Sequence, residues 1–171
     1  MSKKAQREVG GMFLYRLTYI SRQTDSYRQQ GALHLKTILQ RSRTFNGVHG
    51  ITGMLFVAEK YFLQVLEGGR PEVNMLLGKI AADPRHTDLT VVSAGQVLER
   101  AYERWSMSAI RVKNPQATAF KKHLPSGFDP FELTEGTIER FLATAYEMVA
   151  AGSGGGDQNI QISQSEGRDF A

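Results

Sequence analysis

The feature that most constrains the fold is a pair of short apolar segments that lie almost next to each other in the chain. Residues 53–58 (GMLFVA) and 61–66 (YFLQVL) are rich in the apolar and aromatic side chains typical of strands. Only Glu59 and Lys60 separate them, and a connection of two residues can join two strands only as a tight hairpin. The sequence therefore predicts two antiparallel strands paired side by side.

The segments on either side of this hairpin have the periodicities of further strands and of two amphipathic helices. Apolar residues recur at helical spacing over residues 32–45 and again over 72–82, where Pro71 is suited to the first turn. The predicted elements are, in chain order, a strand at 13–20, a polar loop at 21–31, a helix at 32–45, the hairpin, a helix at 72–82, and strands at 89–97 and 105–112. This βαββαββ order describes an α+β, ferredoxin-like sandwich with both helices on one face of the sheet.

The ends of the chain differ in composition from this core. Residues 1–11 are polar and end in two glycines, which indicates a flexible N-terminal extension. Residues 113–150 contain loop signals and then, over 135–150, apolar residues at helical spacing. We expect C-terminal helices here, the last of which covers the exposed sheet face or a partner. Residues 151–171 begin with a glycine-rich run, which predicts a disordered tail.

The complete absence of cysteine excludes several classes of function. None of the 171 residues is a thiol, so disulfide scaffolds, thiolate zinc sites, iron–sulfur clusters, cysteine nucleophiles and flavin–cysteine adducts are ruled out. The four histidines are scattered and no acidic pair stands at metal-ligand spacing, so we expect no metal site. No segment has the apolar length of a membrane span and no signal peptide is visible, which predicts a cytoplasmic protein.

The charge balance bears on whether the chain binds nucleic acid. The chain has 21 Lys and Arg against 17 Asp and Glu, a net charge of +4 that is too small to indicate such a partner. RNA-recognition domains also have a βαββαβ core and stack bases on aromatic residues of their middle strands. The glycine and aromatic spacing of that motif is absent here. An RRM-like nucleic-acid-binding domain without flavin is therefore an alternative that the fold allows and the residues do not favour.

Two polar residues stand inside otherwise apolar strands. Gln64 lies between Leu63 and Val65 in the second strand of the hairpin, and Tyr19 lies near the end of the first strand of the chain. A buried amide or phenol left without a partner costs about 1 to 3 kcal/mol, so each of these side chains needs one. The simplest arrangement is a hydrogen bond between Tyr19 and Gln64 that bridges two strands.

Five short motifs, taken together with their order and spacing, resemble those of a known family. They are residues 14–21 (LYRLTYIS), Asn46 with 51–55 (ITGML), 62–68 (FLQVLEG), 83–86 (DPRH) and 105–107 (WSM). Asn46 precedes Gln64 by 18 residues (64 − 46 = 18), and Trp105 follows Gln64 by 41 (105 − 64 = 41). Over residues 12–112 the chain resembles a BLUF domain, a blue-light sensor that uses FAD.

The resemblance implies a site that holds FAD noncovalently between the two helices. It implies that Tyr19 donates an electron and a proton to the excited flavin, and that Gln64, between the phenol and the flavin ring, rearranges and changes its hydrogen bonds. Other positions are implied to contact the flavin or to carry the signal. Those expected beside the flavin are Asn46, Arg85, His86, Leu35, Ile38, Leu39 and Ser42, and those expected to signal are Trp105 and Met107.

The resemblance also implies what the chain does with light. No enzymatic domain is recognisable after the sensor, so we expect a short, non-enzymatic photoreceptor, a homo-oligomer, that signals through residues 113–150 to a separate response protein. The residues leave open whether Trp105 or Met107 lies beside Gln64 in the dark. A flavoprotein that uses FAD for redox chemistry in the dark is the other alternative.

Overall fold

The structure is a computed structural model that describes residues 13–58, 60–104, 106–113, 129–152 and 160–163. Its elements are β1 (Leu14–Gln23), α1 (Asp25–Val48), β2 (Thr52–Ala58), β3 (Tyr61–Gly69), α2 (Arg70–Ala81), β4 (His86–Gln96), β5 (Ser108–Val112), the 3-10 helix η3 (Pro130–Glu132), α3 (Glu135–Ala150) and β6 (Ile160–Ser163). The strands form one sheet in the order β4-β1-β3-β2-β5-β6, in which only the β2–β5 pair is parallel. The predicted ferredoxin-like fold and its hairpin, closed by the pair Ala58 and Tyr61, are confirmed.

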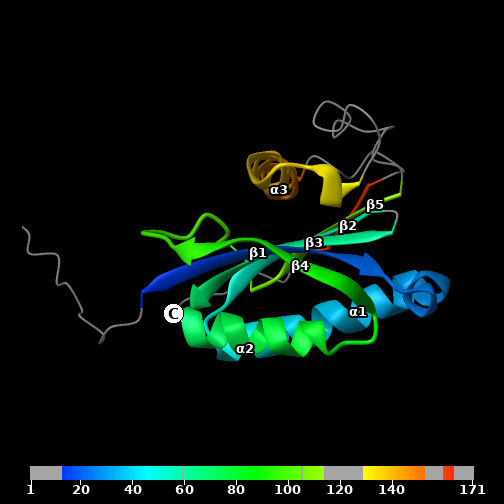
Figure 1. The fold of residues 1–171 in the computed structure, drawn as a ribbon, viewed down its shortest axis with the longest axis horizontal. Helices are drawn as coiled ribbons and strands as arrows, with labels where there is room; N and C mark the ends of the chain where they lie inside the picture. Colours follow the sequence, from blue (N-terminus) through cyan, green and yellow to red (C-terminus); the bar gives the residue numbers. More distant parts are fainter. Residues whose placement is uncertain (1–12, 59, 105, 114–128, 153–159, 164–171) are drawn as a thin grey trace, which may run out of the picture.

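The sheet has a helical layer on each face (Figure 1). Helices α1 and α2 lie together on one face, as predicted, and α3 lies on the other. Side chains of β3 alternate between the two layers because successive residues of a strand point to opposite faces. Phe62 and Leu66 join the cluster under α1 and α2, whereas Leu63 and Val65 join the cluster under α3.

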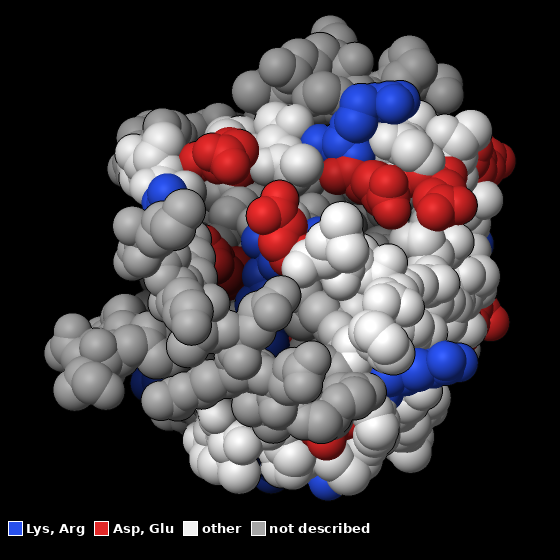
Figure 2. All heavy atoms as spheres, turned by 90° about the vertical axis from the view of Figure 1, so that its left-hand side faces the viewer, with Lys and Arg blue, Asp and Glu red and all other residues white. Residues whose placement is uncertain are grey.

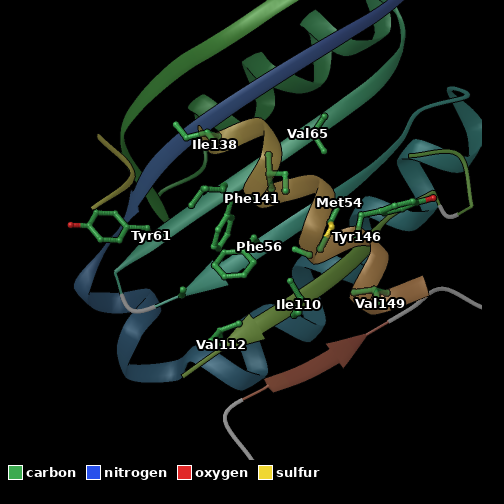
Figure 3. Close-up of a cluster of buried hydrophobic side chains, with 14 of the residues drawn as sticks. Met54, Phe56, Tyr61, Val65, Ile110, Val112, Ile138, Phe141, Tyr146 and Val149 are labelled. Atoms are coloured by element: carbon green, nitrogen blue, oxygen red, sulfur yellow. The ribbon is translucent and has the colours of Figure 1, made fainter. Parts of the chain in front are cut away.

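The core under α3 shows what the apolar face of the C-terminal helix covers (Figure 3). Phe141 packs edge-on against Phe56 of β2, with ring centroids 4.5 Å apart, and Ile138, Tyr146 and Val149 extend the same buried cluster. The Thr134 side chain accepts a hydrogen bond from the backbone N–H of Thr137 and so caps the start of α3. The predicted helix at 135–150 is confirmed. Its apolar face was expected to cover either the sheet or a partner, and it covers the sheet.

The predicted loop at residues 21–31 is wrong. β1 continues to Gln23 and α1 begins at Asp25, so a strand and a helix are separated by Thr24 alone. The first turns of α1 are polar and lack an apolar stripe, which is why periodicity did not indicate a helix there. Tyr27 anchors this part of α1 because its buried ring packs edge-on against Phe62 at 4.8 Å.

The chain ends also differ from expectation where the structure describes them. Ile160–Ser163 form β6, paired antiparallel with β5, so the prediction of a disordered tail does not hold for these residues. The isoleucines at 160 and 162 alternate with polar residues, as in a half-buried strand, but the segment is too short to stand out beside its glycine-rich neighbours. The predicted N-terminal extension, 1–11, lies outside the described residues, and the proposed division at 112 and 150 stays a prediction. None of the described helices is long and apolar enough to cross a membrane.

Candidate functional site

A cavity of about 780 Å³ opens between α1, α2 and the face of the sheet that they cover. Its walls are mainly apolar, and polar groups line it from the sheet, from the loop before β4 and from α1 and α2. The residues predicted from the sequence that line it are Tyr19, Ile38, Ser42, Gln64, Arg85 and His86. A cavity of this size, with apolar walls and a few convergent polar groups, is typical of a site for an organic cofactor.

Tyr19 and Gln64 form the polar floor of this cavity. They are direct partners in the antiparallel pairing of β1 and β3, and the Tyr19 hydroxyl donates a hydrogen bond of 2.5 Å to Gln64 Oε1. Both side chains are buried, with 1% and 4% of their surface exposed. Burial raises the pKa of Tyr19 far above its ordinary value, so the phenol is neutral at every physiological pH. The expected bond between the two polar residues is present.

Met107 is the second partner of the Gln64 amide. Gln64 Nε2 donates to Met107 Sδ across 3.4 Å, and Met107 is fully buried just before β5. A thioether sulfur is a weak acceptor, so this bond holds the amide less firmly than the bond to Tyr19. Of the two predicted signalling residues, the structure therefore places Met107 beside Gln64, and Trp105 lies outside the described residues.

His86 lies against both strands of the floor. Its Nδ1 is 2.8 Å from Ser21 Oγ, and its ring is edge-on to Tyr19 at 6.2 Å and tilted over Phe62 at 4.4 Å. Burial lowers the pKa of His86 to about 4, so its ring is neutral near pH 7. Its neighbour Arg85 is paired with the Asp83 carboxylate.

The lowered pKa of His86 predicts a pH dependence of stability. The unfolded chain binds the His86 proton with a pKa near 6.5, so between about pH 6.5 and 4 protonation favours the unfolded chain. The neutral ring contributes fully to the free energy of unfolding above pH 6.5, and this contribution is lost as the pH falls toward 4. We expect urea unfolding to show wild type losing about 3 kcal/mol more stability than His86→Gln between pH 7 and pH 4. Equal losses of stability in wild type and His86→Gln would show that the pKa of His86 is not lowered by folding.

Asn46 lies near the end of α1 and is completely buried, although it is not among the residues that line the cavity. Its Nδ2 donates to the Ser106 carbonyl oxygen at 2.8 Å, while its Oδ1 has no hydrogen-bond partner among the described residues. A buried acceptor left without a donor is costly, so a polar ligand that offers an N–H would suit this position.

The other predicted wall residues are divided between the cavity and the core. Ile38 and Ser42 line the cavity. Leu35 and Leu39 are buried in the cluster beneath α1 and are not among the lining residues. All three apolar positions repeat at helical spacing, and that pattern alone does not tell which of them borders the cavity.

Sequence reasoning missed part of the lining. Leu55 of β2 and Leu76 and Ile80 of α2 contribute apolar walls, although the helical stripe on α2 indicated only core. Phe45, His49 and Lys79 border the cavity at the ends of the two helices. Only the general expectation that the ligand lies between these two helices could have identified them from the sequence.

The sheet face that an RRM-like domain would use to bind nucleic acid is covered by α3. An RRM-like domain binds RNA on the sheet face opposite its two helices. That face is packed here against α3 through the cluster that contains Phe56 and Phe141. On the end of the molecule seen in Figure 2, acidic and basic side chains are interspersed over the described surface and do not form a basic stripe.

The chain is similar to known light sensors along most of its described length. The family described as "Sensors of blue-light using FAD" (BLUF) matches residues 14–108. Photoactivated adenylate cyclase subunit beta from Euglena gracilis is 37% identical over 102 residues, 59% of this chain, and subunit alpha is 32% identical over 107 residues, 63% of this chain. The chain spans only 12% and 10% of the lengths of these two relatives.

Solved structures of shorter proteins match more completely. The photo-activated state of BlsA is 30% identical and superposes with a TM-score of 0.68, covering 78% of this chain and 94% of that protein. The dark state of BlrB, a BLUF protein, is 29% identical with a TM-score of 0.60, covering 78% of this chain and 98% of BlrB.

Proposed function

Because the chain belongs to the BLUF family, and is thus a flavin-binding blue-light sensor, we propose that it reads light through the hydrogen-bonded pair Tyr19 and Gln64. The observation that carries this proposal is the buried chain of bonds from the Tyr19 hydroxyl to Gln64 Oε1 and from Gln64 Nε2 to Met107 Sδ. It lies on the floor of the cavity between α1 and α2, where it can respond to a bound ligand.

The residues around the cavity suit a flat ring with an apolar body and a polar edge. Ile38, Leu55 and Leu76 would pack against its faces. Asn46 would offer its unpaired Oδ1 to an N–H of the ring, and Arg85, His86 and Ser42 would contact the remaining polar edge. Bound FAD or FMN supplies absorption of blue light and an electron-accepting ring.

Tyr19 would act as the photochemical donor. It is a neutral, oxidisable phenol, and a phenol that gives up an electron becomes a strong acid. Its hydroxyl oxygen lies 2.5 Å from Gln64 Oε1 and donates to it, so the proton has an acceptor that needs no water and no rearrangement. Leaving a charge in this buried position would be costly, which favours movement of the proton together with the electron.

Gln64 would convert that proton movement into a change of hydrogen bonding. Its amide has two donor hydrogens and an acceptor oxygen, and rotation or tautomerisation exchanges what it offers to each neighbour. Leaving Met107 Sδ costs little because sulfur is a weak acceptor. The new arrangement would alter the hydrogen bonds offered to the ligand and the contact with Met107 at the same time.

Signal transmission would follow the backbone around Met107, with Trp105 at the adjoining position. The Ser106 carbonyl accepts a hydrogen bond from Asn46, and the backbone N–H of Arg104 donates to the Tyr146 hydroxyl on α3 at 3.1 Å. This short segment thus touches α1 on one side of the sheet and α3 on the other. We propose that residues 12–112 are the sensor and 113–150 the output segment, acting on a separate response protein, in a homo-oligomer and without enzymatic activity of their own.

The experiment that tests this function is a spectrum of the purified full chain. We expect a yellow protein with oxidised-flavin absorption that moves slightly to the red under blue light and recovers in darkness. A protein that stays colourless after reconstitution with FAD would contradict the function. Two results would favour the dark redox flavoprotein instead. One is a flavin that only bleaches under light, and the other is a protein that oxidises a reductant in the dark and shows no reversible shift of its spectrum.

A further inference from the structure

One arginine on β1 joins the sheet to the segment that leads into α3. Arg22 Nη1 donates to the Tyr61 hydroxyl of β3 at 3.2 Å, and its Nε lies 3.3 Å from a carboxylate oxygen of Asp88 on β4. Beyond the sheet, its guanidinium carbon lies 4.4 Å from the centre of the Phe131 ring in η3, and its Nη2 lies 4.0 Å from Asp129 Oδ2. We call these five residues the Arg22 cluster. Through one side chain it connects three strands with η3.

The contacts of this cluster require the shape of an arginine side chain. The guanidinium carbon of Arg22 is also 5.3 Å from the centre of the Tyr61 ring, and the Tyr61 and Phe131 rings are 6.1 Å apart. In Figure 3, Tyr61 lies at the margin of the core under α3, with its hydroxyl directed away from the other labelled side chains. A planar, delocalised cation lies over both rings while its N–H groups face a hydroxyl and two carboxylates, and a lysine ammonium cannot reproduce this set of contacts.

Asp88 has an unusual backbone conformation where it meets Arg22. Its φ is 53°, and no other non-glycine residue that the structure describes has a positive φ. The pairing of β1 with β4 shifts its register at the same place, between Ile20 and Arg22. A left-handed backbone is disfavoured for a residue with a Cβ and persists only where surrounding contacts maintain it. The Arg22 cluster therefore lies where these two strands can adjust their pairing.

The residue before Arg22 connects the same strand to the cavity on the other face of the sheet. Successive residues of a strand point to opposite faces, and Ser21 Oγ lies 2.8 Å from His86 Nδ1. His86 lines the cavity, and its ring packs edge-on against Tyr19. Direct contacts thus run from Tyr19 to the part of β1 that carries Arg22.

We propose that Arg22 is a positioning residue for the light response, which holds residues 129–138 in their dark position and releases them when the contacts of β1 at the cavity change. The inference rests on the proposed function, since it requires a light reaction at Tyr19. It adds a second connection between the sensor and the proposed output segment. The bond between Arg104 and Tyr146 attaches near the end of α3, whereas Arg22 attaches before its start.

The test is hydrogen exchange of the backbone amides of residues 131–138 in the flavin-loaded full chain, measured in darkness and under blue light. In wild type we expect light to speed this exchange about 3- to 10-fold, the effect of losing one half-exposed ion pair and one cation–π contact. Arg22→Gln should exchange at the faster rate already in darkness, and light should change that rate by less than about twofold. The reversible red shift of the flavin should remain as in wild type, because Arg22 does not line the cavity.

Two further substitutions and a control separate positioning from a general loss of stability. Arg22→Lys keeps the charge and loses the planar group, so its exchange in darkness should fall between wild type and Arg22→Gln. Asp129→Asn keeps an oxygen that can accept from the Phe131 N–H and removes the charge that faces Arg22, so combining it with Arg22→Gln should add little. Arg28→Gln, at an exposed arginine paired with Asp25 at the start of α1, is the matched control and should behave as wild type.

The outcomes distinguish this inference from the function on which it rests. A reversible red shift in wild type with no light-dependent change of exchange at residues 131–138 would overturn the role of Arg22 and keep the photoreceptor. If Arg22→Gln exchanged faster in darkness and still gained the full wild-type increase under light, the contact would be purely structural and the inference would be overturned. Absence of any red shift in wild type would remove both.

Discussion

Replacing Tyr19 with Phe is expected to abolish the reversible red shift while the protein keeps its flavin. The substitution removes the hydroxyl that donates to Gln64 Oε1 and leaves the aromatic ring in its place on β1. Without a phenol proton, the cavity floor has no group that can give up a proton together with an electron. Flavin affinity should change by less than about threefold, because the lost hydrogen bond is to Gln64.

The measurement is the difference spectrum under blue light, with flavin content determined after denaturation. Gln64→Leu should give the same loss, since it removes the acceptor of the Tyr19 proton and the amide that rearranges. Tyr15→Phe on the same strand is the matched control, because Tyr15 does not line the cavity. Normal cycling in either Tyr19→Phe or Gln64→Leu would show that the assigned roles are wrong even though the chain is a BLUF protein.

Replacing Glu67 with Ala is expected to cost about 3 kcal/mol of stability, because it removes the buried partner of a half-buried ion pair and the acceptor of two backbone N–H groups. Glu67 is completely buried, and its carboxylate accepts hydrogen bonds from Arg16 Nε at 2.7 Å and from the backbone N–H groups of Ala101 and Tyr102 at 3.0 and 2.9 Å. The substitution would leave Arg16 Nε and two backbone N–H groups without their acceptor. Glu67 stands three residues after Gln64 on β3, and its carboxylate also holds the connection between β4 and β5 in place.

Urea unfolding measures this loss. Glu67→Gln keeps an acceptor oxygen and should fall between wild type and Glu67→Ala, and Glu103→Ala, an exposed position on the same connection, serves as the control. If Glu67→Ala lost less than about 1 kcal/mol, water would be replacing the carboxylate and the connection would be held by other contacts.

Local spacing made much of the fold predictable. Two residues between apolar strands permit only a hairpin, and Pro71 followed by an apolar stripe permits a helix start, so β2, β3 and α2 could be assigned from the sequence. The first turns of α1 could not, because they are anchored by a long-range contact, between Tyr27 and Phe62, and not by a repeating pattern. β6 was missed for a related reason: its pairing with β5 depends on a neighbour far away in the chain.

The site divides in a similar way. A phenol and an amide inside apolar strands must find partners, so the bond between Tyr19 and Gln64 was predictable from the sequence. The place of Phe45 and His49 in the cavity lining was not, because they stand near the end of α1, where such residues equally serve as core and as helix terminus. The approach of Lys79 from α2 to the Phe45 ring depends on how the two helices meet.

The sheet separates two sets of buried side chains, and this division has a consequence for engineering. On β2, for example, Leu55 packs toward α1 and α2, while Phe56 packs toward α3. Substitutions in sets that share no contacts are usually additive to within about 0.5 kcal/mol. The underside of α3 can therefore be redesigned, for instance around Phe141, with its effect on stability accounted for separately from the chromophore pocket. The Arg104–Tyr146 bond, which joins α3 to the segment that leads to Met107, is the place where such additivity should fail.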